Sequence, residues 1–169
     1  MLVDLPRGRW QAPPGSSWDR LGLDIQDVGR AARPWQERYR DVRWLGRRYG
    51  LILCCEGGGY FENDRCDRQT VQPGDVCLLF PGIWHGYGPT RHTVWGEAWC
   101  LFDGPAARAL WRNAPLSPLR PVVHPPDQAG LERSMRRLQQ AVRQDRAAAL
   151  PAALVDLLVR CVQGCVPMG

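Results

Sequence analysis

The chain has 169 residues, a length that fits one domain with a hydrophobic core of its own. Its 22 basic side chains are all arginine, and against 17 acidic ones they give a net charge of +5. The arginines are spread from Arg7 to Arg160, and no segment has the pattern of a nucleic-acid-binding module. We therefore interpret the charge as solvated surface rather than as a surface for direct contact with DNA.

Seven cysteines, an odd number without a CxxC pair, favour reduced thiols that act as small hydrophobic side chains. This use of cysteine is typical of a cytoplasmic protein. The N-terminal segment has no apolar run, so a secretory signal is not expected. The most apolar stretch, residues 147–159, is interrupted by Pro151 and Asp156 and is shorter than the roughly 20 residues of a membrane span.

Residues 1–24 are rich in Pro, Gly and Arg and are expected to form an N-terminal arm or an irregular strand. Short apolar runs separated by turn residues then follow between residues 36 and 102. The predicted strands cover residues 37–44, 49–55, 59–63, 68–72, 76–80, 85–87 and 93–102. Repeated short strands of this kind indicate a barrel or a sandwich rather than alternating strands and helices.

After Asp103 the pattern becomes helical. A short helix is predicted at residues 104–111, so residues 25–112 are assigned to the β-domain, and a Pro-rich connector follows at residues 113–130. In residues 131–165 apolar side chains recur at helical spacing and predict two antiparallel helices. The expected fold is therefore mainly β, an antiparallel barrel of jelly-roll type followed by a helical hairpin.

The second helix of the hairpin, from Leu150 to about Gly164, is apolar over most of its circumference. Such a helix must be covered on two sides, and we predict that the barrel covers one side and a second copy of the chain the other. The alternative is a helix that packs only within its own monomer. The residues predicted for dimerisation are Leu150, Leu154, Leu157, Leu158 and Cys161.

His85 is the first candidate for chemistry, because histidine is a common metal ligand. A catalytic metal needs about three protein ligands around an open position. The strand at residues 49–55 and the residue after it offer only Cys54, Cys55 and Glu56, and the two neighbouring cysteines face opposite sides. We therefore predict a structural or ligand-contacting role for His85 and no bound metal.

The strand at residues 93–102 places Trp95, Glu97, Trp99 and Leu101 on one face. Two indoles around a carboxylate would form a wall for a small molecule, because aromatic faces stack on apolar rings or on the C–H surface of a sugar. The carboxylate would accept hydroxyl or amine donors. The alternative is that both tryptophans belong to an ordinary core and that Glu97 is paired with an arginine.

Arg43 is the third candidate. Tyr39, Asp41 and Arg43 alternate on one face of the strand predicted at residues 37–44. An unpaired arginine inside a barrel is costly, whereas a paired one offers a planar fork of donors for carboxylates or vicinal hydroxyls. The alternative is an ordinary surface position.

Three segments, by their order and spacing, resemble the sensing domain of AraC-type transcription regulators. They read RWLGRRYGLIL at residues 43–53, PGDVCLLFPGIWHGYG at residues 73–88 and WGEAWCLF at residues 95–102, and the helix pair follows. The spacing Gly-Asp-x5-Pro-x3-His in the second segment is similar to the second motif of cupin barrels. The resemblance implies a cupin-like ligand-binding barrel, a homodimer formed through the terminal helices, and a DNA-binding domain downstream.

In the arabinose-responsive member of this family an Arg, a Tyr and a Trp contact the sugar, and by the match they fall on Arg43, Tyr87 and Trp99. Glu97 stands where that member uses a His, which argues against arabinose as the ligand. The arm that closes over ligand in that member has no counterpart in residues 1–24. The helix-turn-helix domain is absent from this chain, which is therefore expected to be the sensing half of a regulator; the alternative is a free-standing sensor.

The sequence thus predicts a ligand-sensing and dimerisation domain of a cytoplasmic AraC-type regulator, with no catalytic activity, cofactor or membrane contact. Its effector is expected to be a sugar or another small polar metabolite, and DNA is expected to be contacted only through the downstream domain. The predicted ligand-binding residues are Arg43, Tyr87, Glu97 and Trp99, with Trp95 and His85 as additional contacts. Two alternatives are a metal-dependent cupin enzyme that uses His85 and a ligand-free dimerisation module.

Overall fold

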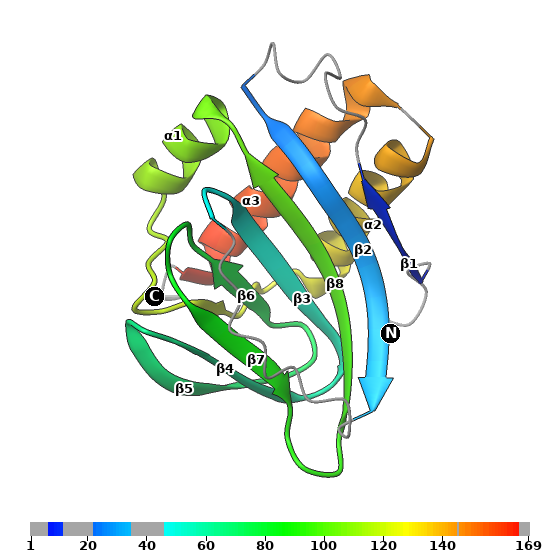
Figure 1. The fold of residues 1–169 in the computed structure, drawn as a ribbon. Coiled ribbons are helices and arrows are strands. Elements are labelled where there is room, and N and C mark those ends of the chain that lie inside the picture. Colours follow the sequence, from blue (N-terminus) through cyan, green and yellow to red (C-terminus); the bar gives the residue numbers. More distant parts are fainter. Residues whose placement is uncertain (1–6, 12–21, 35–45, 145, 166–169) are drawn as a thin grey trace.

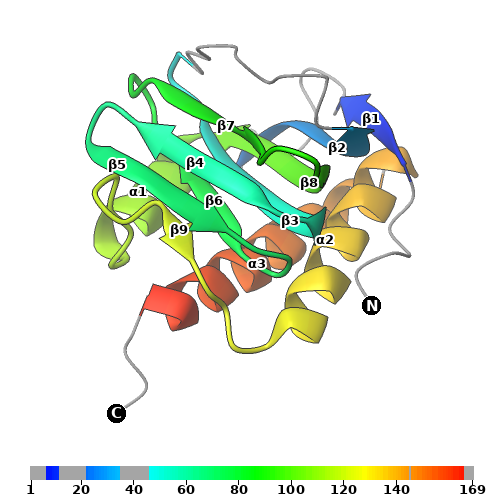
Figure 2. The ribbon, with the colours of Figure 1, turned by 90° about the horizontal axis from the view of Figure 1, so that it is seen from below.

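Two antiparallel sheets face each other, and helices cover the outer face of the larger sheet (Figures 1 and 2). They are seen in a computed structural model of the protein, which describes residues 7–11, 22–34, 46–144 and 146–165. The strands are β1 (Gly8–Gln11), β2 (Asp24–Pro34), β3 (Tyr49–Gly57), β4 (Gly59–Asn63), β5 (Cys66–Val71), β6 (Val76–Leu79), β7 (His85–Pro89), β8 (Val94–Asp103) and β9 (Val122–Val123). The helices are α1 (Pro105–Asn113), α2 (Gln128–Arg143) and α3 (Leu150–Cys165), and a short 3-10 turn at Ala147–Ala149 precedes α3.

The larger sheet has the strand order β1-β2-β8-β3-β6-β9, and the smaller sheet has the order β5-β4-β7. The closed barrel that we predicted is wrong for the described residues, because the hydrogen-bonded ladders end at these edges and the sheets stay separate. The ladder stops where strands become too short to continue it, since β9 has two residues and β1 has four. The fold is therefore a cupin-like antiparallel sandwich with helices at its C-terminal end.

Strand β8 lies in the middle of the larger sheet, between β2 and β3, and each of its two faces packs in a different hydrophobic core. Ala98, Cys100 and Phe102 belong to the core between this sheet and the helices. Trp95, Trp99 and Leu101 belong to the second core, which lies between the two sheets. The alternation predicted for this strand is thus confirmed, and it sends the candidate ligand residues toward the smaller sheet.

Strand β2 is eleven residues long and was not predicted from the sequence. Its pattern is obscured by Asp27, Gly29 and Arg30, and the pairing with β8 shifts register between Ile25 and Asp27. Residues 8–11, which we placed in an arm or irregular strand, form β1 and pair with β2 at the sheet edge. The strand predicted at residues 37–44 lies outside the described residues.

The Pro-Gly-Asp turn before β6 is held to two other parts of the chain. Gly74 has a φ of 95°, a value that favours glycine, and its N–H donates to the Cys54 carbonyl at 2.8 Å. Asp75 accepts the backbone N–H of Gln72 at 2.7 Å through Oδ2. Its Oδ1 lies 2.6 Å from Nδ1 of His124, a residue of the connector for which the sequence indicated no role. The turn therefore fixes the connector against the sandwich.

Asp127 is the N-cap of helix α2, and its side chain accepts the Gly130 N–H at 2.8 Å. The apolar face predicted for α2 is confirmed, and it packs on the larger sheet. Its buried residues include Leu131, Met135, Leu138 and Val142. Gln139 is fully buried, and its Nε2 donates to the Gly29 carbonyl at 2.9 Å, which ties α2 to β2.

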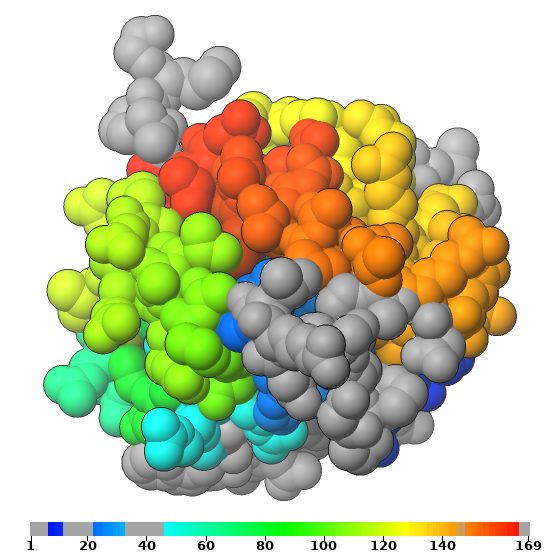
Figure 3. Space-filling model, turned by 90° about the horizontal axis from the view of Figure 1, so that it is seen from above, coloured from blue at the N-terminus to red at the C-terminus, as the bar shows by residue number. Residues whose placement is uncertain are grey.

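Helix α3 corrects the predicted dimer contact. Leu150, Leu154, Leu157, Leu158 and Cys161 are at most 5% exposed and belong to the core of the same chain. These five side chains therefore cannot form the contact with a second copy, because they already pack on α2 and the larger sheet. Helix α3 lies beside α1 on the outer surface (Figure 3). Val155 and Val159 are the apolar side chains of α3 that stay 37% and 50% exposed.

Within the described part of the chain, no helix has the length and apolar character that a transmembrane span requires.

Candidate functional site

An aromatic cluster fills the space between the sheets. Trp95 is fully buried on β8, and the Tyr87 ring from β7 lies 5.7 Å from it, centroid to centroid. Tyr87 also stacks on Phe61 of β4 at 6.5 Å and on His85 at 6.2 Å. Three predicted site residues, His85, Tyr87 and Trp95, are therefore brought together by strands from opposite sheets.

Glu97 is a buried carboxylate beside this cluster, with 3% of its surface exposed. Oε2 of Glu97 accepts the indole N–H of Trp95 at 2.8 Å. Cys54 lies opposite Glu97 in the pairing of β3 with β8. The carboxylate is thus fixed by an aromatic donor beside a largely apolar core, where hydrogen bonds to a charged acceptor are stronger than in water.

Trp99 is half-buried, and its ring leans toward β2. Its Nε1 donates to Oδ1 of Asp27 at 2.8 Å, and Asp27 is only 3% exposed. The other oxygen of Asp27 accepts Nε of Arg9, from β1, at 2.6 Å. Gly29 is paired with Trp99 across the two strands, and a Cβ there would lie 2.7 Å from Cη2 of the indole. The bare backbone of Gly29 therefore leaves the space that the Trp99 ring occupies.

Arg43 lies outside the described residues, so its predicted contact stays a prediction. The other five ligand candidates lie on β7 and β8, and the tryptophans and Tyr87 share one apolar cluster.

Sequence reasoning missed Asp27, Gly29 and Arg9, which position Trp99. All three lie on β1 or β2, where charged and glycine residues hide the strand pattern. An Asp and a Gly two residues apart, with no evident role in the sequence, could have drawn attention to this segment. Their partner across the sheet, however, cannot be identified without the pairing register.

The thiols of the sandwich are poor nucleophiles. Burial, followed by the influence of neighbouring charges, raises the pKa of Cys54 to about 12. Burial likewise raises the pKa of Cys55 to about 12, against the opposing effect of Arg30. Because the thiolate is the reactive form, these groups are inert near neutral pH.

Among the residues that the structure describes, no three His, Cys, Asp or Glu side chains are grouped so that they could hold a metal ion. The His85 ring lies beside two aromatic rings, with Phe61 at 6.3 Å and Tyr87 at 6.2 Å, centroid to centroid. The residues brought together here offer aromatic rings, a buried carboxylate and a phenol.

Comparison with protein families bears on this geometry. The sequence model described as the AraC-like ligand binding domain matches residues 26–155, more than half of the chain. The chain belongs to the AraC-like ligand binding domain family. This membership supports a ligand-sensing role and a small-molecule effector.

Solved structures similar to this AraC-like domain include several cupins. A cupin protein from Bacteroides fragilis is 15% identical, with a TM-score of 0.45 over 62% of this chain and 81% of that one. The protein YhaK from Escherichia coli is 11% identical, with a TM-score of 0.48 over 59% of this chain and 45% of that one. A predicted oxalate decarboxylase from Thermotoga maritima is 14% identical, with a TM-score of 0.43 over 61% and 96%. Among curated proteins, none matches this chain.

Proposed function

We propose that the chain is the ligand-sensing and dimerisation domain of an AraC-type transcription regulator, and that its effector is a sugar or another small polar metabolite bound between the sheets. The observation that carries this proposal is the meeting of Tyr87, Trp95 and Glu97 between the sheets of a domain from a ligand-binding family. Aromatic faces beside a buried acceptor suit a molecule with both C–H surface and hydroxyl or amine donors.

Each candidate contact has a defined part in this proposal. Tyr87 would stack on the effector or donate to it, Trp99 would stack on it, and Glu97 would accept its hydroxyl or amine protons. His85, which stacks on Tyr87, would contact the effector or hold the phenol in place. Arg43 would supply a guanidinium for hydroxyl or carboxylate oxygens, as the family resemblance implies.

The homodimer would use the apolar surface that the chain leaves exposed on α1 and α3. Leu110, Val155 and Val159 are 41%, 37% and 50% exposed, and they line one groove of about 170 Å³. A second copy that covers these side chains would bury the outer side of α3, as its sequence predicts.

Signalling would follow from a difference in effector affinity between two states of the domain. Helix α2 is bonded to Gly29, and Gly29 lies against Trp99, so a change at the indole can reach the helix pair. The DNA contact would be made by a separate DNA-binding domain. All seven cysteines are free thiols, which accords with a cytoplasmic regulator.

A thermal-shift screen of the purified chain against sugars, polyols, sugar acids and small amines tests this function. A ligand that binds only the native state raises the melting temperature, and calorimetry then gives its affinity. The Glu97→Gln variant should weaken that affinity about tenfold or more, because it replaces a charged acceptor. Glu62→Gln is the matched control, since Glu62 pairs with Arg68 near the surface of the smaller sheet.

Two outcomes would overturn the proposal. A screen in which no compound stabilises the chain would favour a module that only forms dimers. One equivalent of tightly bound iron, zinc or manganese in protein purified without chelator, lost in His85→Ala, would favour a metal-dependent cupin enzyme.

A further inference from the structure

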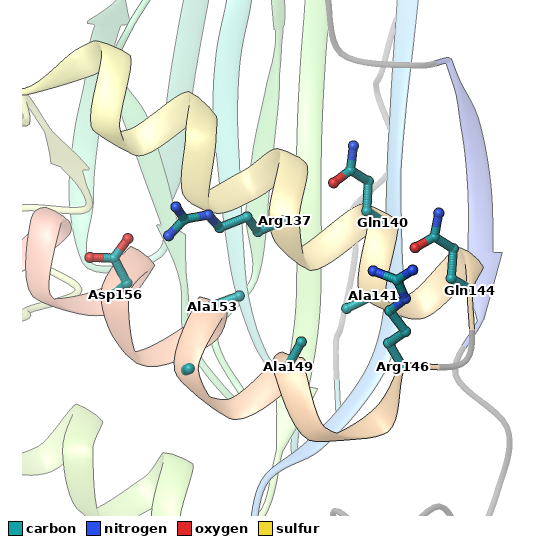
Figure 4. Close-up of a pocket in the computed structure, with 9 residues that line it drawn as sticks. Arg137, Gln140, Ala141, Gln144, Arg146, Ala149, Ala153 and Asp156 are labelled. Carbon is teal, nitrogen blue, oxygen red and sulfur yellow. The ribbon is translucent and has the colours of Figure 1, made fainter.

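A second groove lies on the other side of the larger sheet, between α2 and α3 (Figure 4). Its volume is about 310 Å³, which is enough for a small molecule. It is lined by residues of both helices and of the turn between them, and it is distinct from the core between the sheets. An inference about it therefore does not depend on the proposed function.

The polar side of the groove comes from α2 and the residues after it. Arg137, Gln140 and Gln144 follow one another at helical spacing, and Arg146 comes directly after the helix end (Figure 4). Two guanidiniums and two amides thus line one groove, and each can donate hydrogen bonds outward. The Arg146 side chain extends toward Gln144 in this view.

The floor of the groove is made by alanines. Ala141 comes from α2, and Ala149, Ala152 and Ala153 come from the start of α3 and the turn before it. Small side chains on both helices leave the space, and the long side chains of α2 border it. The hollow is therefore built into the helix pair, and the Cβ atoms of the floor offer no acceptor that would engage the arginines.

The charges of the groove do not cancel. Its carboxylate, Asp156, accepts from Ser134 and from Nε of Arg160, the latter at 3.2 Å. The Ser134 hydroxyl, Arg160 and, more weakly, Arg137 lower the pKa of Asp156, so this carboxylate is ionised and already engaged. Among the described residues, neither Arg137 nor Arg146 forms an ion pair with a carboxylate.

The end of α2 does not repel an anion as strongly as a bare helix end would. The Gln140 carbonyl accepts the N–H of Gln144 at 3.0 Å, and the Ala141 carbonyl accepts the N–H of Arg146 at 2.8 Å. The last carbonyls are therefore partly satisfied, and their negative partial charge is reduced toward the groove.

We propose that this groove binds a small molecule with two anionic groups, carboxylate or phosphate, which are held by the guanidiniums of Arg137 and Arg146. The planar guanidinium matches both kinds of oxyanion, and Gln140 on α2 and Gln144 at its C-cap donate to the same molecule. The alanine floor accepts its short carbon or phosphoanhydride backbone. Because the groove is open to water, the affinity is salt-dependent.

The test is calorimetric titration of the chain at low ionic strength with succinate and, separately, with pyrophosphate. We expect saturable one-to-one binding of at least one of them, with a Kd on the order of 1 mM or tighter. Succinamide, which has the succinate skeleton without its charges, should not bind. The anion with the lower Kd shows whether the site prefers carboxylates or phosphates.

Variants decide whether the binding belongs to this groove. Arg137→Gln and Arg146→Gln should each raise the Kd about tenfold or more, because each removes a charge-assisted contact. Ala152→Leu should also weaken binding, since it fills the floor without changing any charge. Arg112→Gln is the matched control, because it removes an exposed charge from α1 and should leave the Kd unchanged.

The proposal would be overturned if neither succinate nor pyrophosphate bound saturably. A loss of affinity in Arg112→Gln as large as that in Arg137→Gln would also overturn it, because binding would then respond to net charge alone. A normal Kd in Ala152→Leu would also contradict it.

Discussion

The indole of Trp99 and the carboxylate of Asp27 are joined across the larger sheet by a hydrogen bond of 2.8 Å from Nε1 to Oδ1. Asp27 is 3% exposed, and its second oxygen accepts from Arg9, so one carboxylate links β8, β2 and β1. The position of the predicted ligand-binding indole is thus set by Asp27 of β2, which β1 supports from the edge of the sheet.

We expect Asp27→Ala to lower the free energy of unfolding by about 1–3 kcal/mol, because it leaves a part-buried indole N–H without its acceptor. Urea unfolding measures this change. Asp67→Ala, at an exposed position of β5, is the control and should change stability by less than about 0.5 kcal/mol. Equal unfolding midpoints for the two variants would contradict the role given to Asp27.

Gly29→Ala should lower the free energy of unfolding by about 1–3 kcal/mol, because the added Cβ would overpack the sheet. It would lie 2.7 Å from Cη2 of Trp99 and 2.7 Å from the Gly8 carbonyl oxygen. Gly86→Ala is the matched control, since a Cβ there meets its nearest atoms at an ordinary 3.5 Å. The prediction is wrong if the two variants unfold at the same urea concentration.

The buried thiols predict a loss of stability in alkali. Burial raises the pKa of Cys54 from 9.0 to about 12, so the folded chain keeps this proton where the unfolded chain releases it. The stabilisation is complete below about pH 9 and is lost as the pH rises toward 12, because deprotonation then favours the unfolded chain. Urea midpoints at about pH 8 and about pH 10.5 should therefore differ, with the lower midpoint in alkali.

Two variants separate this effect from other alkaline titrations. Cys54→Ala removes a buried thiol and should reduce the difference between the two midpoints. Cys66→Ala removes a half-buried thiol at the start of β5 and should reduce it less. If both variants reduced the difference between the two urea midpoints equally, the buried thiol of Cys54 could not be its source.

The dimer contact on α3 is tested by Val159→Glu, which places a charge on the 50% exposed apolar surface. If a second copy covers this surface, the variant sediments as a monomer at concentrations where the parent chain is a dimer. Val94→Glu, at a 47% exposed position on β8, should leave the dimer intact. A Val159→Glu chain that stays dimeric would exclude this surface as the interface.

The parts of the fold with a simple periodicity could be predicted from the sequence. The alternation of β8 predicted correctly which side chains share a face, and the helical spacing of Leu131 and Met135 predicted the buried side of α2. For α3 the same reasoning failed at Leu154 and Leu158, because a helix that is apolar all round does not reveal which side its own chain covers.

The contacts that position the site residues were harder to predict from the sequence. Asp27 acts on Trp99, which is 72 residues away along the chain, and that contact depends on a strand whose pattern is broken by a bulge. Sheet closure was also beyond the sequence, because it depends on how far the short edge strands continue their ladders.

The central claim is that the effector lies between the two sheets. Fluorine NMR of the chain labelled with 5-fluorotryptophan, with each signal assigned by a Trp→Phe variant, tests it directly. Trp95 and Trp99 belong to the core between the sheets, whereas Trp111 packs against Tyr49 and Phe80 on the helix side. We predict that an effector from the thermal-shift screen moves the signals of Trp95 and Trp99 and leaves that of Trp111 in place. Movement of the Trp111 signal alone would contradict the account.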